Sequence, residues 1–173
     1  FVFLNFLSLP TLLYILITYT HKKIISFFVG WVFGFGYFIS NLYWITNSLT
    51  FDVNFKLIIP FALILIPLFL GIFYGLVTFL SSLFNLKNKL SSVLIFSIFF
   101  GGIEFLRSFI LGGFPWNLLV FSISNNLPSL QILSYVGTYS LNLLSITIFL
   151  LPIIFFNKYK GYALSRIHIS EPT

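Results

Sequence analysis

The chain has no cysteine and no methionine, and only 7% of its 173 residues are charged. Without cysteine it forms no disulfide, no thiolate nucleophile and no cysteine-ligated metal site. A soluble globular domain carries roughly 25% charged residues, so the scarcity of charge excludes that class of protein. The missing methionine and the apolar start at Phe1 lead us to expect a fragment of a longer reading frame.

The chain is rich in apolar and aromatic side chains. Hydrophobic residues make up 59% of the chain, and its mean hydropathy is +1.08. Because one bilayer crossing needs about 20 such residues, the length fits about five crossings. We therefore predict an all-α integral membrane protein, a polytopic helical bundle of about five transmembrane helices. The net charge of +6 lies mostly between apolar runs, which indicates membrane topology and not nucleic-acid binding.

The expected spans are residues 4–19, 24–49, 57–84, 90–111 and 134–156, within one membrane domain at 1–157. Lysine pairs follow the first, third and fifth spans. The positive-inside rule places those turns in the cytoplasm and the end of the fourth span outside. A polar tail follows at 158–173, and its last ten residues resemble a translated sequencing adapter. The alternative is the start of a polar linker.

Two pairs of glycines recur at a spacing of four residues, Gly30 with Gly34 and Gly71 with Gly75. This spacing puts both glycines of a pair on one helix face, where another helix backbone approaches closely. We expect both faces to serve helix packing. His21 beside two lysines indicates an interfacial position, since no second ligand stands at metal-binding spacing.

Within the apolar runs there is one carboxylate and one guanidinium, Glu104 and Arg107. Three residues apart on a helix, they share a face and neutralise each other. Charges at membrane depth are costly and often mark a functional site. The alternative is a structural ion pair that holds one helix to the bundle.

The segment after this helix, residues 112–133, has no charge but is interrupted by glycine, proline and asparagine. Irregular backbone at membrane depth needs protein or a water-filled cavity around it. We expect either an interfacial loop or a partly re-entrant segment. A polar and aromatic cluster around Trp44 ends the second span and is either an interfacial belt or the lining of a site.

Several short stretches together resemble the membrane region of the apolipoprotein N-acyltransferase family over roughly residues 1–156. They are FGFGYF at 33–38 with LYWI at 42–45, EFLR at 104–107, GFPWNL at 113–118, and LQ at 130–131 before YVG at 135–137. The resemblance implies a membrane domain of eight helices that carries a periplasmic nitrilase-like domain. The spans here correspond to the second through sixth of those helices.

The reaction that the resemblance implies moves an acyl chain from a phospholipid to the N-terminal diacylglyceryl-cysteine of an apolipoprotein. In the family a cysteine takes the acyl group first, a glutamate acts as base, and a lysine stabilises the oxyanion. No residue of this chain corresponds to these three, so we expect no catalytic residue here and no activity from the chain alone.

The resemblance gives residues of this chain another role, to shape an outer-leaflet cavity for the lipid substrates. The candidates are Glu104, Arg107, Gly113, Phe114, Pro115, Trp116 and Trp44. The expected partners are the phospholipid donor, the diacylglyceryl apolipoprotein acceptor and membrane lipids, in a multi-pass protein of the bacterial inner membrane. No cofactor, metal or nucleic acid is expected. The alternatives are a small transporter or channel subunit and a purely structural membrane protein.

Overall fold

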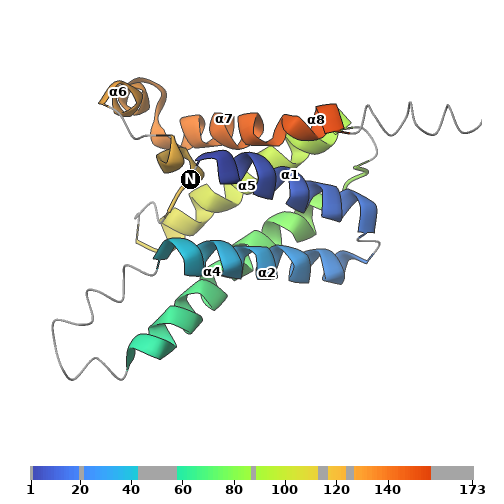
Figure 1. Ribbon diagram of the computed structural model, residues 1–173, viewed down its shortest axis with the longest axis horizontal. Coiled ribbons are helices and arrows are strands. Elements are labelled where there is room, and N and C mark those ends of the chain that lie inside the picture. The colour runs from blue at the N-terminus through green and yellow to red at the C-terminus, as the bar shows by residue number, and fades with distance from the viewer. Residues whose placement is uncertain are drawn as a thin grey trace, which may run out of the picture.

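The computed structural model describes residues 2–19, 22–42, 58–86, 89–112, 117–123 and 127–156 (Figure 1). Its helices are α1 (Val2–Tyr19), α2 (Lys23–Leu42), α4 (Ile59–Ser81), α5 (Lys89–Ile110), the 3-10 turn η2 (Leu119–Ser122), α6 (Leu127–Val136), α7 (Thr138–Leu150) and α8 (Pro152–Phe156). These described ranges contain no strand. Within these ranges four helices, α1, α2, α4 and α5, are long and apolar enough to cross a membrane, and Thr138–Ile154 is a shorter apolar stretch. The predicted all-α polytopic membrane bundle is confirmed.

The helix bounds refine the expected spans. The expected span 24–49 overlaps α2, which begins one residue earlier at Lys23, and residues 43–49 lie outside the described part. The expected span 134–156 is divided between α6, α7 and α8. Gly137 has φ +84, a backbone conformation that glycine adopts without steric cost, and Pro152 has no amide hydrogen to continue α7. The tail at 158–173 lies outside the described residues, so the domain boundary stays a prediction.

As predicted, both glycine pairs serve helix packing, and the structure shows that they bring α2 and α4 together. A Cβ at Gly34 would lie 2.9 Å from the Cα of Gly71, and a Cβ at Gly71 would lie 2.9 Å from the carbonyl oxygen of Trp31. Side chains larger than hydrogen would therefore force the two backbones apart. Beside this contact, Thr78 Oγ1 donates a hydrogen bond of 2.7 Å to the carbonyl oxygen of Ser26.

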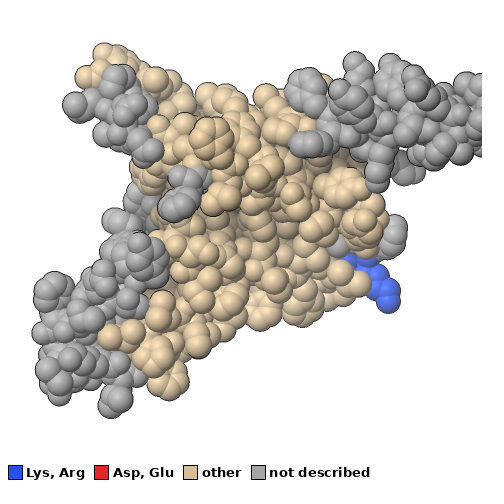
Figure 2. All heavy atoms as spheres, viewed as in Figure 1, with Lys and Arg blue, Asp and Glu red and all other residues tan. Residues whose placement is uncertain are grey.

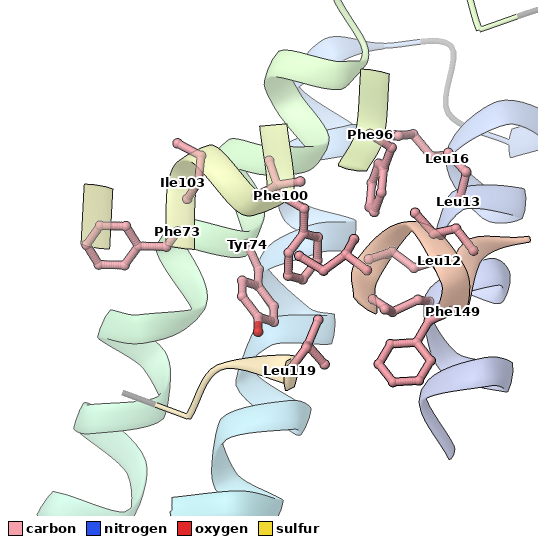
Figure 3. Packing of buried hydrophobic residues seen from close by; sticks show 14 of the residues in the cluster. Leu12, Leu13, Leu16, Phe73, Tyr74, Phe96, Phe100, Ile103, Leu119 and Phe149 are labelled. Atoms are coloured by element: carbon pink, nitrogen blue, oxygen red, sulfur yellow. The ribbon is translucent and has the colours of Figure 1, made fainter. Parts of the chain in front are cut away.

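The core lies where α1, α4, α5 and α7 meet, and it is largely aromatic. Figure 3 shows Tyr74 and Phe100 from α4 and α5 facing Leu12 of α1 and Phe149 of α7. The rings of Tyr74 and Phe100 are 4.6 Å apart between centroids. Leu119 of η2 belongs to the same core, so the turn is anchored in the bundle although it lies outside the long helices.

The outer surface is apolar, as expected for a bundle surrounded by lipid. Large hydrophobic side chains such as Phe3, Phe61 and Phe109 are 86%, 63% and 77% exposed. Figure 2 shows a face nearly free of described charge, with basic side chains at one edge, at the turn between α1 and α2. Lys22 lies in this turn, and Lys23 is the first residue of α2.

Candidate functional site

The ion pair predicted from the sequence is present and completely buried. Glu104 and Arg107 lie one turn apart on α5, both have 0% exposed side chains, and Arg107 Nη2 is 3.8 Å from Glu104 Oε1. The Arg107 guanidinium also lies over two aromatic rings, 5.0 Å from the centroid of Phe38 and 6.0 Å from that of Tyr74. Such cation–π contacts stabilise a desolvated guanidinium. Arg107 also stands in the last turn of its helix, where a positive charge interacts favourably with the helix dipole.

The Glu104 carboxylate accepts hydrogen bonds from two other helices. Tyr74 of α4 donates its hydroxyl hydrogen to Oε1 at 3.0 Å, and Asn142 of α7 donates from Nδ2 to Oε2. Since an unsatisfied carboxylate in hydrocarbon costs several kcal/mol, these bonds explain how the charge is tolerated at this depth. The carboxylate thereby joins α4, α5 and α7.

Asn142 connects the Glu104 carboxylate to the segment after α5. Its Nδ2 is committed to Glu104, which leaves Oδ1 pointing the other way, and Oδ1 accepts a hydrogen bond of 3.0 Å from the backbone N–H of Val120. Val120 is fully buried in η2. A buried amide needs such a partner. The Glu104 carboxylate therefore positions η2 through the Asn142 side chain.

A cavity of about 1230 Å³ lies between α1 and α2, and residues 117–122 form part of its wall. Two hydrogen bonds join this wall to the helices. Asn5 Nδ2 donates to Ser122 Oγ at 3.0 Å, and the Tyr37 hydroxyl donates to the carbonyl oxygen of Asn117 at 3.4 Å. Tyr37 also contacts Tyr74, with ring centroids 5.5 Å apart. One side of Tyr37 thus faces the buried network and the other faces the cavity.

The structure brings together only part of the predicted site. Glu104 and Arg107 form the centre of the buried network, but neither is among the residues that line the cavity. The other candidates, Gly113, Phe114, Pro115, Trp116 and Trp44, lie outside the described residues. Gly112, which precedes the loop, has φ +82 and ends α5 in the manner of a helix C-terminal glycine. The role of all seven candidates in a substrate cavity stays a prediction.

Sequence reasoning missed the partners of the carboxylate. Tyr74 lies in a predominantly apolar span, and aromatic residues are common in membrane helices, so the sequence does not indicate that Tyr74 bonds to a carboxylate. Asn142 is one of several polar residues in the first half of α7. An uncharged amide in a membrane helix is a usable signal, because it usually bonds to another helix. Among the described residues, no cluster of histidine, cysteine, aspartate or glutamate side chains could hold a metal ion.

Comparisons with known proteins identify the family. Residues 1–151 match the family model of the apolipoprotein N-acyltransferase N-terminal domain. The apolipoprotein N-acyltransferase of Allorhizobium ampelinum is 30% identical over 164 residues, which cover 85% of this chain and 31% of that protein. The enzyme of the same name from Brucella melitensis is 35% identical over 125 residues, or 72% of this chain and 23% of the relative.

A third relative, from Rhizobium rhizogenes, is 33% identical over 128 residues, covering 73% of this chain and 24% of that protein. The matched segments thus cover 23% to 31% of the length of these three relatives. No solved structure matches it. Because the family model covers most of its length, the chain belongs to the apolipoprotein N-acyltransferase family, whose N-terminal domain it contains.

Proposed function

We propose that this chain is part of the membrane domain of an acyltransferase that moves an acyl chain from a phospholipid to the N-terminal diacylglyceryl-cysteine of apolipoproteins. The observation that carries the proposal is the family match over residues 1–151. In this proposal the protein lies in the bacterial inner membrane, with the end of α5 and the following loop toward the outer leaflet. One-sided lysines at the α1–α2 turn support that orientation.

The chemical step belongs to other residues of the complete enzyme. Acyl transfer through a covalent intermediate needs a nucleophile beside a base. The chain has no cysteine, and the Glu104 carboxylate is already occupied by Tyr74, Asn142 and Arg107. Glu104 is therefore a positioning residue in this proposal. It fixes Asn142, Asn142 fixes η2, and η2 forms one wall of the cavity between α1 and α2.

A chimaeric enzyme tests the proposal directly. Residues 1–151 of this chain would replace the matching segment of the Allorhizobium ampelinum relative, and the chimaera would be expressed in a bacterium depleted of its own enzyme. We expect mass spectra of a model lipoprotein to show the third acyl chain on its N-terminal peptide. The control is the same chimaera with the relative's catalytic cysteine replaced by serine, which should insert equally well and transfer nothing.

A chimaera that inserts to the level of the parent enzyme, resists protease as the parent does, and still leaves the amino group unacylated would contradict the proposal. The transporter and structural interpretations would then be the remaining ones. Recovering the uninterrupted gene from its source adds an independent test. A reading frame that lacks a downstream cysteine with glutamate and lysine partners is incompatible with the proposed chemistry.

A further inference from the structure

The side of α2 that faces away from α4 is open and carries a regular stripe of residues. Members of this stripe are exposed, line the cavity between α1 and α2, and recur every four positions: Phe28, Val32, Gly36 and Ser40. Gly34 lies on the opposite side from Gly36, because two residues turn a helix by about 200°, and that side packs on α4. α2 therefore has one packed face and one open face.

α1 presents a similar face to the same cavity. It runs beside α2 in the opposite direction (Figure 1). Among its lining residues is a series with the three- and four-residue spacing of one helix face: Leu4, Ser8, Thr11 and Ile15. Two neighbouring helices with such faces leave a groove between them, and the side-chain ridge of a third helix fits a groove of this kind. We call this cavity the α1–α2 groove.

Gly36 and Ser40 have the spacing of the two glycine pairs that pack α2 on α4. At each of the four glycines in those pairs, an added Cβ would lie at most 2.9 Å from an atom of the facing helix. By contrast, a Cβ at Gly36 would meet no atom within 4 Å. Small residues four positions apart let another membrane helix approach closely. The face around Gly36 and Ser40 is therefore shaped for a helix that the described residues do not supply.

Hydroxyl groups on both walls of the groove bond to their own helices. Thr11 donates to the carbonyl oxygen of Leu7 at 2.6 Å, and Ser40 donates to that of Gly36 at 2.7 Å. None of the described lining residues is charged. A transmembrane helix also satisfies its backbone groups internally. It can therefore occupy the groove without requiring a polar partner from these walls.

The groove has the size of one helix over about three turns. On α1 its lining runs from Leu4 to Ile15, about 16 Å at 1.5 Å per residue. A helix about 10 Å wide occupies roughly 1,300 Å³ over that length, and the groove holds about 1230 Å³. More than two thirds of each of the three relatives lies outside the segment that this chain matches. Proteins of this family therefore have ample further sequence from which such a helix could come.

We propose that the α1–α2 groove receives a transmembrane helix of the complete protein, supplied by residues outside the 173 of this chain. The helix that fits is free of charge over about 11 residues and packs its side chains over Gly36 and Ser40. The inference rests on the proposed function only in treating the chain as part of a longer family member. In the complete protein the groove is then filled by protein, so the lipid substrates of the proposed reaction bind elsewhere.

A photo-crosslinker identifies what fills the groove. p-Azidophenylalanine would replace Phe28, an aromatic groove residue that is 49% exposed. The probe would be placed both in the full 173-residue chain and in the chimaera that carries residues 1–151. After illumination in phospholipid vesicles, mass spectrometry identifies the crosslinked partner. We expect a crosslink to a helix of the relative's own sequence in the chimaera, and to lipid in the 173-residue chain, where that helix is absent.

Two glycines provide matched variants. Gly36→Leu overpacks the proposed helix contact and should reduce the crosslink yield in the chimaera at least about fivefold. In the 173-residue chain the same variant should leave the thermal midpoint unchanged or raise it, because a Cβ at Gly36 meets no atom there and leucine favours a helix over glycine. Gly102→Leu of α5 is the control. Gly102 is equally open but does not line the groove, so the crosslink yield should stay unchanged.

Three results would overturn the inference: a crosslink from the Phe28 position to lipid alone in a chimaera that inserts and resists protease, a crosslink between differently tagged copies of the chimaera, or equal yields for Gly36→Leu and the unmodified groove. The crosslink requires no catalysis. If the chimaera transfers acyl chains while the probe meets only lipid, only this inference fails. If the probe meets a helix while an inserted chimaera transfers nothing, only the proposed function fails.

Discussion

Replacement of the buried ion pair offers the sharpest test of how the site is held together. With Arg107 Nη2 3.8 Å from Glu104 Oε1, an effective dielectric constant of about 20 gives an attraction of about 4 kcal/mol. Removing either partner leaves the other charge buried, at a cost of about 3–5 kcal/mol. Removing both leaves no orphan charge. We therefore expect Glu104→Gln and Arg107→Met to be strongly non-additive.

The measurement is a double-mutant cycle on the free energy of unfolding. The wild type, the two single variants and the double variant would be unfolded reversibly in mixed micelles of a mild detergent with increasing dodecyl sulfate, followed by circular dichroism. The double variant should be less destabilised than the sum of the single variants by about 3–4 kcal/mol. Arg107→Lys serves as the control because it keeps the charge, although it loses the planar stacking on Phe38.

Additive losses, within about 0.5 kcal/mol, would refute the reasoning. In that case the two residues would act independently, and the hydrogen bonds from Tyr74 and Asn142 alone would account for the stability of the buried carboxylate. A cycle in which the double variant is more stable than the wild type would agree with the pair interaction. Buried ion pairs are sometimes less stable than apolar replacements of similar volume.

Three further predictions follow from the helix contacts. Asn142→Leu removes the hydrogen-bond acceptor of the Val120 amide, so hydrogen exchange at that amide should become at least about tenfold faster while the long helices stay protected. An exchange rate at Val120 equal to that of the wild type would contradict the positioning role. Gly34→Leu forces α2 from α4 and should lower the thermal midpoint, whereas Gly102→Leu should leave it unchanged or raise it; equal shifts would exclude close packing as the cause. Because the chain has no cysteine, single cysteines can be introduced to report membrane sidedness. The variant Trp116→Cys should react with an impermeant maleimide only from outside the membrane, and a cysteine in the α1–α2 turn should react only from inside. Labelling with the opposite sidedness would reverse the proposed orientation.

The helices and the pairing on α5 could be predicted because both depend on local sequence. A run of about 20 apolar residues sets a membrane helix by the thickness of the bilayer. A spacing of three residues places Glu104 and Arg107 on one face whatever surrounds them. The glycine spacing on α2 and α4 predicted close packing for the same reason, although not which helix would meet which.

The division of the last expected span was harder to foresee. Gly137 and Pro152 are visible in the sequence, but glycine and proline also occur inside continuous membrane helices, as Pro67 does in α4. Neighbouring helices decide whether such a residue ends a helix, because they supply or withhold partners for the freed backbone groups. The sequence therefore indicated possible break points without selecting among them.

By itself the sequence determined that this is a helical membrane protein, where its long helices lie, and that its two intramembrane charges form a pair. Only the tertiary structure decided what the carboxylate does. Tyr74 and Asn142 are 30 and 38 residues from Glu104 along the chain, and the cavity arises between α1 and α2 with a wall from residues 117–122. Such contacts depend on how helices cross, and the crossing is set by packing among many apolar side chains that resemble one another in sequence.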